Sequence, residues 1–383
     1  MKKKDRIVVA LSGGVDSSVA ALLLKNAGYD VIALFMRNWH DDSLTINNEC
    51  PWTEDSNYAL GICDQLGIPF QIIDLSKEYK ERIVDYMIQE YKKGYTPNPD
   101  ILCNREIKFD VFLKYAMKLN ADYIATGHYC IKKIAPERHT LHRGKDRVKD
   151  QSYFLCQITQ EQLKKIIFPI GHLTKKEVRK IAKNNDLITA QKKDSQGLCF
   201  VGKIKLPVFL QNQIKSRKGD IIEINANSDI YKKEVGFGNE RIYSPSQGDK
   251  IGRHDGAHYF TIGQRKGLKI GGKEKPLFVI ATDVKKNIIY VGMGSNHPGL
   301  FRNNLKILAS SINWLKKHEE MESSEIREYQ VRIRHRQSLQ KARLIMKKKY
   351  LYIAFAKQQR SIAKGQFAAW YKKNELIGSG PII

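Results

Sequence analysis

The sequence lacks several patterns that would assign it to familiar classes. Its six cysteines include no C-x-x-C pair, which disfavours a zinc ribbon, a zinc finger and a thioredoxin-like redox pair. No apolar run approaches the roughly 18 residues of a membrane helix. The apolar stretch from Ile7 to Leu11 is also shorter than the core of a signal peptide. We therefore expect a cytoplasmic protein that contacts no membrane and has no permanent disulfide framework.

Acidic residues are scarce in the last part of the chain. Residues 331–383 contain 13 Lys or Arg but a single acid, Glu375, whereas residues 1–100 contain 11 basic and 15 acidic residues. The whole chain carries a formal net charge of +26. Simple drift in composition would affect all segments alike, so this asymmetry favours a polyanionic partner such as a nucleic acid. A merely solvated basic surface remains the alternative.

The first part of the sequence alternates short apolar runs with amphipathic segments. The expected strands are 6–11, 31–36, 70–75 and 123–126. The expected helices are 15–27, 55–66, 78–93 and 104–119. This alternation is typical of a parallel sheet with helices on both faces. Ligands of such sheets bind at the carboxyl ends of the strands.

The later segments differ in pattern. Residues 131–150 are polar without a clear period and are predicted to form a loop, whereas Thr174 to Glu177 form a capping box that opens a helix. After about residue 205, β-branched and glycine-rich stretches indicate strands, including 277–284 and 288–291. The predicted division is an α/β domain over 1–205, a central β-rich connector over 206–275, and a basic, RNA-binding β-barrel over 276–383.

The first expected strand leads directly into a glycine and serine loop, Ser12 to Ser18, and then into a helix. Glycines let the backbone approach an anion, the first helical N–H groups point toward it, and serine hydroxyls add donors. Both the Walker loop and the dinucleotide G-x-G-x-x-G are absent. Asp16 is a candidate ligand for a Mg²⁺ ion shared with phosphates. The loop resembles the PP-loop of ATP pyrophosphatases, which split ATP between its α and β phosphates and adenylate an oxygen.

Further segments select one branch of that superfamily. They are Asn98 to Asn104, Lys149 to Tyr153, Lys193 to Phe200, Tyr259 to Arg265, and the arginine-rich stretch near residue 334. Together they closely resemble the tRNA-specific 2-thiouridylase family over nearly the whole chain. The resemblance implies an ATP-dependent sulfurtransferase that converts the wobble uridine of certain tRNAs to 2-thiouridine.

The chemistry of that reaction requires two thiols. The C2 oxygen of uridine is a poor leaving group until it is adenylated, and sulfur must arrive as a cysteine persulfide that a second cysteine can cleave. The resemblance implies that Cys199 carries the persulfide and that Cys103 is the nucleophile, with a transient disulfide between them. Cys103 follows a proline-containing turn at an expected helix start, where the helix dipole favours a thiolate. Taken alone, each of these cysteines is better interpreted as a buried structural thiol than as a catalytic one.

The resemblance also implies the remaining site residues. Asp100 is a candidate acid or base at the target uridine, with a turn or cap aspartate as the alternative. The implied ATP site comprises Ala10, Leu11, Ser12, Gly13, Gly14, Val15, Asp16, Ser17, Met36 and Gly127. The implied tRNA contacts are Asn98, Pro99, Asp100, Lys149, Asp150, Gln151, Arg334 and His335. His128 is interpreted as a structural histidine at the edge of the sheet.

The stretch from Val331 to Gln337 alternates apolar and basic residues. As a strand, it would place Arg332, Arg334 and Arg336 in a row on one face. Such a row suits RNA phosphates, although a solvated face is the alternative. Because Arg334 and His335 would then point to opposite faces, one of them would need a bend to reach the same RNA.

The sequence hypothesis is thus an enzyme that uses ATP and Mg²⁺, binds tRNA, and receives sulfur from a persulfide-donating relay protein. We expect a monomer. Two alternatives stay open at this point. One is another PP-loop tRNA-modifying enzyme, similar to lysidine synthetase, which would need no thiols. The other is a non-enzymatic RNA-binding protein with an inactive nucleotide loop.

Overall fold

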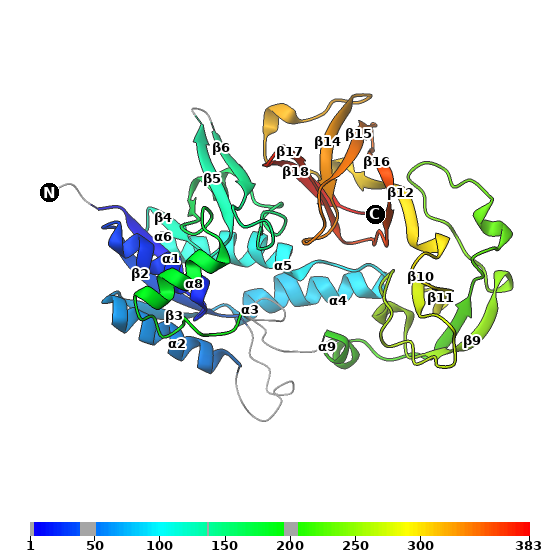
Figure 1. The fold of residues 1–383 in the computed structure, drawn as a ribbon, viewed down its shortest axis with the longest axis horizontal. Coiled ribbons are helices and arrows are strands. Elements are labelled where there is room, and N and C mark those ends of the chain that lie inside the picture. The colour runs from blue at the N-terminus through cyan, green and yellow to red at the C-terminus, as the bar shows by residue number, and fades with distance from the viewer. Residues whose placement is uncertain (1–3, 39–50, 136–137, 195–205) are drawn as a thin grey trace. The chain divides into compact units, whose positions relative to one another are not determined.

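The computed structural model describes residues 4–38, 51–135, 138–194 and 206–383. The chain forms two compact units. The N-terminal unit contains Met1–Asp85, Pro99–Lys205 and Lys372–Gly378, and the C-terminal unit contains Tyr86–Asn98, Leu206–Tyr371 and Ser379–Ile383. Each unit is therefore assembled from segments that are far apart in the sequence (Figure 1). In the part of the chain that the structure describes, no helix is long and apolar enough to cross a membrane.

The N-terminal unit is built on a parallel sheet of five strands in the order β3-β2-β1-β4-β7. Its strands are β1 (Arg6–Ala10), β2 (Asp30–Arg37), β3 (Phe70–Asp74), β4 (Tyr123–Ala125) and β7 (Ile166–Ile167). Ile7, Val8 and Val9 of the central strand β1 are completely buried, as expected for a strand covered on both faces. The four strands predicted from apolar runs are thus confirmed, and β7 was too short to be predicted.

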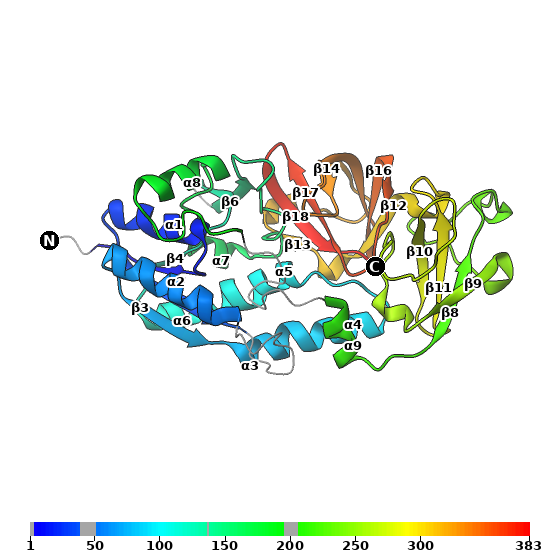
Figure 2. The ribbon, with the colours of Figure 1, turned by 60° about the horizontal axis from the view of Figure 1, so that its bottom comes forward.

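Helices cover this sheet. In the N-terminal unit they are α1 (Val15–Asn26), α2 (Pro51–Leu66), α3 (Ser76–Tyr79), α5 (Pro99–Leu102), α6 (Phe112–Lys118), α7 (Gln160–Lys164) and α8 (Lys175–Asn184). Helix α4 (Asp85–Lys92) belongs to the C-terminal unit from Tyr86 on. Two π-helical stretches, Lys80–Val84 and Cys103–Val111, join α3 to α4 and α5 to α6. Helix α1 packs against α2 and α8, and α8 lies beside α1 in both views (Figures 1 and 2).

The predicted loop over 131–150 is wrong in its first half. Two strands, β5 (Cys130–Ala135) and β6 (Arg138–Arg143), pair with each other as an antiparallel hairpin. The alternation was hidden because the apolar Ile134 is 78% exposed while the neighbouring polar Thr140 is buried. The hairpin's further partner is also remote in sequence, because His142 pairs with Glu375 of the segment Lys372–Gly378. A local pattern carries no information about such a partner.

The C-terminal unit contains a smaller sheet in the order β10-β11-β8-β9. Its strands are β8 (Gly219–Glu223), β9 (Asp249–His254), β10 (Leu277–Asp283) and β11 (Ile288–Met293), and α9 (Leu206–Gln213) precedes them. Ile221, Val279, Ile289 and Val291 form its completely buried core. A boundary after residue 275 would separate β9 from β10 within this sheet, and the three-domain division stays a prediction.

The remaining strands of the unit form a larger, mainly antiparallel sheet. They are β12 (Phe301–Leu308), β13 (Asn313–Trp314), β14 (Ile326–Arg332), β15 (Gln340–Met346), β16 (Tyr350–Arg360) and β17 (Phe367–Lys372). The last strand, β18 (Glu375–Pro381), belongs to the N-terminal unit as far as Gly378. The order β12-β16-β15-β14-β17 places β14 and β17 side by side. Strand β17 is buried along nearly its whole length and contributes Trp370 and Tyr371, both fully covered.

The predicted row of three arginines is wrong. Strand β14 ends at Arg332, and a turn follows it. The Arg332 side chain is buried, where it donates hydrogen bonds to the Tyr371 hydroxyl at 2.8 Å and to the His335 carbonyl oxygen at 3.2 Å. Arg334 and Arg336 are exposed. The alternating pattern does not predict the exposure of Arg332, because the Tyr371 hydroxyl and the His335 carbonyl oxygen replace water around its guanidinium. These hydrogen bonds offset the free-energy cost of burying the charged group.

Replacing Arg332 by methionine is expected to lower the free energy of unfolding of this unit by about 2–4 kcal/mol. The change removes the hydrogen bonds that the buried guanidinium donates to the Tyr371 hydroxyl and to the His335 carbonyl oxygen, and each hydrogen bond made by a charged group contributes about 1.5–3 kcal/mol. The exposed Arg336→Met variant is the matched control and should stay within about 0.5 kcal/mol of the parent. Urea unfolding followed by tryptophan fluorescence measures both, and equal midpoints for the two variants would contradict the structural role of Arg332.

Candidate nucleotide site and its flanking residues

The loop between β1 and α1 presents the open end of a helix. Gly14 is the N-cap residue with extended backbone angles, and no side chain caps the helix there. The first N–H groups of a helix have no partner within it, so those of the first turn of α1 are available to a ligand. The Ser17 hydroxyl donates to the Gly14 carbonyl oxygen at 3.0 Å and accepts from the Ser12 amide at 3.2 Å. These hydrogen bonds hold the loop next to the first turn of α1, whose free amides and helix dipole attract anions.

Two glycines allow this geometry. Gly13 has a φ of +69°, and a Cβ there would lie 2.0 Å from the carbonyl oxygen of Asp55. A Cβ on Gly127, just after β4, would lie 2.8 Å from the Asp16 carbonyl carbon and from the Ser17 nitrogen. The backbone after β4 therefore touches the first turn of α1. The structure thus brings the predicted loop residues and Gly127 together at the carboxyl ends of β1 and β4.

The other predicted nucleotide residues lie at the same edge. Ala10 ends β1, Leu11 follows it, and both are buried. The Leu11 amide donates to the Leu34 carbonyl oxygen of β2 at 3.0 Å. Met36 lies two residues farther along β2, with its side chain buried. Asn38 follows, and its buried carboxamide has no hydrogen-bond partner among the described residues.

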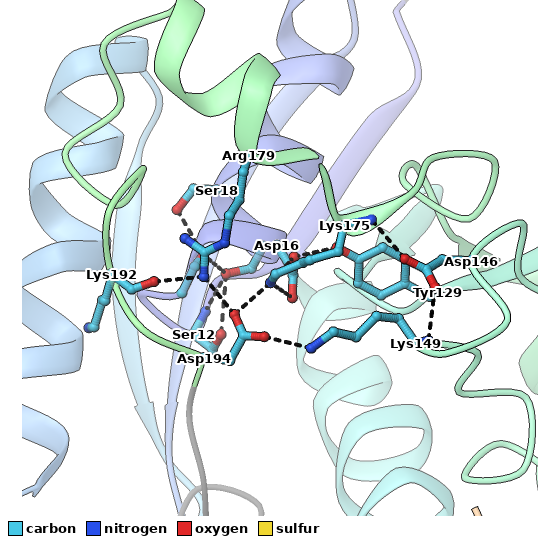
Figure 3. Close-up of polar contacts among 12 residues, drawn as sticks. Ser12, Asp16, Ser18, Tyr129, Asp146, Lys149, Lys175, Arg179, Lys192 and Asp194 are labelled. Atoms are coloured by element: carbon cyan, nitrogen blue, oxygen red, sulfur yellow. Dashed lines mark hydrogen bonds and ion pairs between the residues drawn. The ribbon is translucent and has the colours of Figure 1, made fainter. Parts of the chain in front are cut away.

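A cluster of opposite charges stands beside the loop (Figure 3). The Lys175 ammonium lies 2.8 Å from both carboxylate oxygens of Asp16 and 2.8 Å from an oxygen of Asp194. Asp194 also pairs with Lys149 at 2.7 Å and with Arg179 at 2.9 Å. The Tyr129 hydroxyl donates to Asp16 at 2.7 Å. Two carboxylates thus share three cations at the mouth of the nucleotide loop.

The cluster fixes the charge of its members. Partial burial alone would raise the pKa of Asp194, but the hydrogen bonds and charges of Lys149 and Lys175 outweigh it and lower that pKa to about 2. Burial, together with the negative charge of Asp16, raises the pKa of Tyr129. At neutral pH Asp194 is therefore a carboxylate, and Tyr129 is a neutral phenol that donates to Asp16.

The predicted tRNA contacts Lys149, Asp150 and Gln151 lie just outside this cluster. The Asp150 carboxylate is buried and accepts from Arg143 at 3.0 Å and from the amides of Gly144 and Ser152. Gln151 accepts from the Tyr129 amide at 2.9 Å. Asp150 and Gln151 thus hold the local backbone, and Lys149 is the member whose charged group lies near the surface. Their contact with tRNA stays a prediction.

The predicted uridine site lies around α5. Pro99 opens this helix, and Asp100 occupies its first turn, partly exposed. Cys103 is fully buried in the second turn, at the start of a π-helical stretch. The expectation that Cys103 lies at a helix start is therefore wrong, because the helix begins at Pro99. The dipole effect decays within the first turn, so it favours a thiolate at Cys103 less than expected. Short π-helical segments do occur frequently at functional sites.

The remaining predicted residues are placed as follows. Asn98 belongs to the C-terminal unit and donates to the Gln366 side-chain oxygen at 3.2 Å. Arg334 and His335 lie in the turn after β14, which removes the need for them to face opposite ways. Cys199 lies outside the described residues.

Other candidates have structural environments. His128 is buried against Phe109 and Phe168 and lies 2.8 Å from the Thr126 hydroxyl. Burial and the charge of Lys108 hold its pKa well below the usual value, so it is neutral at physiological pH. Burial, reinforced by the neighbouring carboxylate of Asp64, raises the pKa of the Cys63 thiol to about 12, which makes it unreactive.

Sequence reasoning missed four residues of the charge cluster, namely Tyr129, Lys175, Arg179 and Asp194. Lys175 was within the predicted capping box, and Asp194 was within the segment quoted for Cys199. The capping box is confirmed, with Thr174 as the N-cap of α8. Nothing in the spacing, however, indicates that the start of α8 meets a loop 159 residues earlier in the chain.

The fold and the site together define an α/β nucleotide-binding domain followed by β-rich domains. The model described as the tRNA methyl transferase HUP domain matches residues 5–203, and that of the tRNA methyl transferase PRC-barrel domain matches 228–293. The aminomethyltransferase beta-barrel domain matches 304–382. These matches confirm the predicted fold class. The chain belongs to the tRNA-specific 2-thiouridylase family.

The similarity to curated members extends over nearly the full length. The tRNA-specific 2-thiouridylase of Flavobacterium johnsoniae is 57% identical, over 98% of this chain and 99% of its own. That of Christiangramia forsetii is 55% identical over the same shares. The Bacillus subtilis protein of that name is 42% identical, over 98% of this chain and 94% of its own. The family predicted from the sequence motifs is therefore confirmed.

Proposed function

We propose that this protein is an ATP-dependent sulfurtransferase that replaces the C2 oxygen of the wobble uridine in certain tRNAs by sulfur. The observation that carries the proposal is the anion-binding first turn of α1, bounded by Gly13 and Gly127, in a chain of the 2-thiouridylase family. ATP supplies the adenylyl group that activates the oxygen, and tRNA is the acceptor. Neither lysidine formation nor passive RNA binding requires both the loop and a pair of thiols.

The nucleotide loop fits the phosphates of ATP. The amides of the first helical turn and the Ser12 hydroxyl supply donors, and the glycines leave space where a Cβ would otherwise lie. Among the described residues, no group of three or more His, Cys, Asp or Glu side chains is arranged to hold a metal ion. A Mg²⁺ ion would therefore reach the site on the phosphates, with the Asp16 carboxylate as its protein ligand.

The two thiols account for sulfur transfer after activation. Cys103 attacks the inner sulfur of a persulfide on Cys199, which forms a Cys103–Cys199 disulfide and releases hydrosulfide. Hydrosulfide then adds at C2 of the adenylated uridine, and AMP leaves with the original oxygen. A dithiol reductant restores both cysteines, and a persulfide-donating relay protein reloads Cys199. Asp100, partly exposed in the first turn of α5, is the proposed acid or base at the uridine.

The experiment that tests the proposal is mass analysis of tRNA nucleosides after incubation with the purified protein, ATP, Mg²⁺ and a persulfide donor. We expect 2-thiouridine together with AMP and pyrophosphate. Formation of lysidine would support the first alternative instead. Absence of RNA-dependent pyrophosphate release would support a non-enzymatic RNA-binding protein. Gel filtration at assay concentrations tests the proposed monomeric state.

Arg334 is the proposed phosphate contact of the C-terminal unit. Its exposed guanidinium is held by the carbonyl oxygens of Arg360 and Ser361, the latter at 2.7 Å. Because phosphate contacts release counterions, Arg334→Ala should reduce the slope of log affinity against log salt by a little under one unit. It should weaken tRNA binding about 10-fold at low salt, as expected for one charge-assisted hydrogen bond.

The matched control for this prediction is Arg327→Ala. Arg327 lies on β14 but is paired with Glu325 at 2.8 Å and Glu319 at 3.7 Å, so its charge is largely neutralised. We expect its salt slope to equal that of the parent protein. Filter binding of tRNA at several salt concentrations measures both variants. If plots of log affinity against log salt had the same slope and the same intercept for Arg334→Ala and the parent, Arg334 would not contact RNA.

A further inference from the structure

The nucleotide loop has no lysine of its own, yet a lysine reaches it from elsewhere in the chain. Lys175 is the first residue of α8, and its ammonium contacts both oxygens of Asp16 in the first turn of α1. Only 13% of its side chain is exposed. Helix α8 packs against α1, so the two helix starts lie together. Figure 3 shows Lys175 extending from α8 toward Asp16.

The backbone at Lys175 is held firmly. The Thr174 amide donates to the Glu177 carboxylate at 2.6 Å, and the Glu177 amide donates to the Thr174 hydroxyl at 3.3 Å. The Lys175 amide itself donates to the Asp146 carboxylate at 2.9 Å. A lysine whose main chain is fixed on both sides loses less conformational freedom when it binds a ligand. The capping box therefore organises Lys175 in advance.

The ion pairs of the cluster allow Lys175 to exchange partners at low cost. If Lys175 turned from Asp194 toward an anion at the loop, Asp194 would keep Lys149 at 2.7 Å and Arg179 at 2.9 Å. If Lys175 keeps its contact with Asp16 during this exchange, neither carboxylate is left without a cation, which is the costly outcome for partly buried charges. Arg179 is in turn fixed by the carbonyl oxygens of Ala190 and Lys192.

We propose that Lys175 is the phosphate-binding lysine of this site and contacts the pyrophosphate end of ATP, with Asp194 as its positioning residue. This inference rests on the proposed function. When the uridine oxygen attacks the α-phosphorus, the bond to the bridging oxygen breaks, and its electron pair goes to the departing pyrophosphate. A fixed ammonium beside the loop stabilises that developing charge. Lys175 thus takes the place of the lysine that a Walker loop carries within its own sequence.

The test compares ligands that differ in the pyrophosphate group. Calorimetric titration of the full-length Lys175→Met variant with ATP, inorganic pyrophosphate and AMP separates contacts to that group from contacts to the nucleoside. We expect affinities for ATP and pyrophosphate to fall about 10- to 100-fold and the affinity for AMP to change less than about twofold. Lys175→Arg keeps the charge and should retain most of the affinity for pyrophosphate.

Lys176→Met is the matched control, because Lys176 is the next residue of α8 and is exposed. It makes the same change in net charge and should leave all three affinities unaltered. Unchanged pyrophosphate binding by Lys175→Met, an equal loss for AMP, or an equal loss in Lys176→Met would each overturn the inference. If the parent protein bound neither ATP nor pyrophosphate, the proposed function itself would fail, and the role of Lys175 would fail with it.

Discussion

Replacing Cys103 by serine is expected to bring 2-thiouridine formation below detection, while pyrophosphate release that depends on tRNA and ATP continues. Sulfur transfer follows activation of the uridine, so removal of a sulfur-handling thiol leaves the first step in place. A serine hydroxyl cannot cleave a persulfide to form a disulfide. The same result is expected for Cys199→Ser, which removes the proposed persulfide carrier. Nucleoside mass analysis and a coupled pyrophosphate assay measure the two steps separately.

Cys63→Ala provides the control for this experiment. Cys63 is a buried thiol of the same unit whose pKa is raised to about 12, first by burial and then by Asp64, so it has no thiolate to contribute. We expect its thiolation rate to stay within about threefold of the parent, after correction for a loss of stability of about 1 kcal/mol. Normal thiouridine yield from Cys103→Ser would exclude the two-cysteine mechanism.

Replacing Gly127 by alanine is expected to lower ATP-dependent pyrophosphate release at least about 100-fold, comparable to the loss of one preorganised donor from an anion site. The added Cβ would lie 2.8 Å from backbone atoms of Asp16 and Ser17, a distance that nonbonded carbon and nitrogen atoms do not adopt. Either β4 or the first turn of α1 must shift. The amides of that turn then no longer point at the phosphates, because their direction depends on the helix start.

The measurement for Gly127→Ala is pyrophosphate release at saturating tRNA, with tRNA affinity determined in parallel. The proposed tRNA contacts lie on other segments, so tRNA affinity should change less than about twofold. Gly271→Ala is a suitable control, since a Cβ at Gly271 would meet nothing within 4 Å. If Gly127→Ala released pyrophosphate at the parent's rate, the close approach of β4 to α1 would have no part in nucleotide binding.

The parallel sheet was predictable because its central strands are buried on both faces and their residues are therefore uniformly apolar. Ile7 to Val9 is such a run. The hairpin β5–β6 was not predictable, since its exposed Ile134 and buried Thr140 reverse the usual pattern. The end of β14 was misplaced for a similar reason. Arg332 looks like a surface residue until the Tyr371 hydroxyl, from another strand, is placed beside it.

Within the site, sequence motifs identified residues that act through backbone and local geometry. The loop from Ser12 to Ser17 and Gly127 meet as predicted because both lie at the carboxyl edge of the sheet. Side chains that arrive from a distant helix were missed. Lys175 and Asp194 belong to segments recognised for other reasons, a helix cap and a cysteine motif, and only the packing of α8 on α1 gives them a common role.

The assignment of Lys372–Gly378 to the N-terminal unit has a consequence for how the protein is made. On the ribosome this segment emerges after all of β8 to β17, yet Glu375 pairs with His142 and the Asn374 carbonyl accepts from the Arg143 amide. The hairpin β5–β6 must therefore wait, with its outer edge unpaired, while nearly the entire chain is translated. A nascent chain stalled before residue 372 lacks one strand of its nucleotide-binding unit. Completion of that unit thus reports that translation has passed strands β8 to β17, and partial products are exposed to proteases at an unpaired edge.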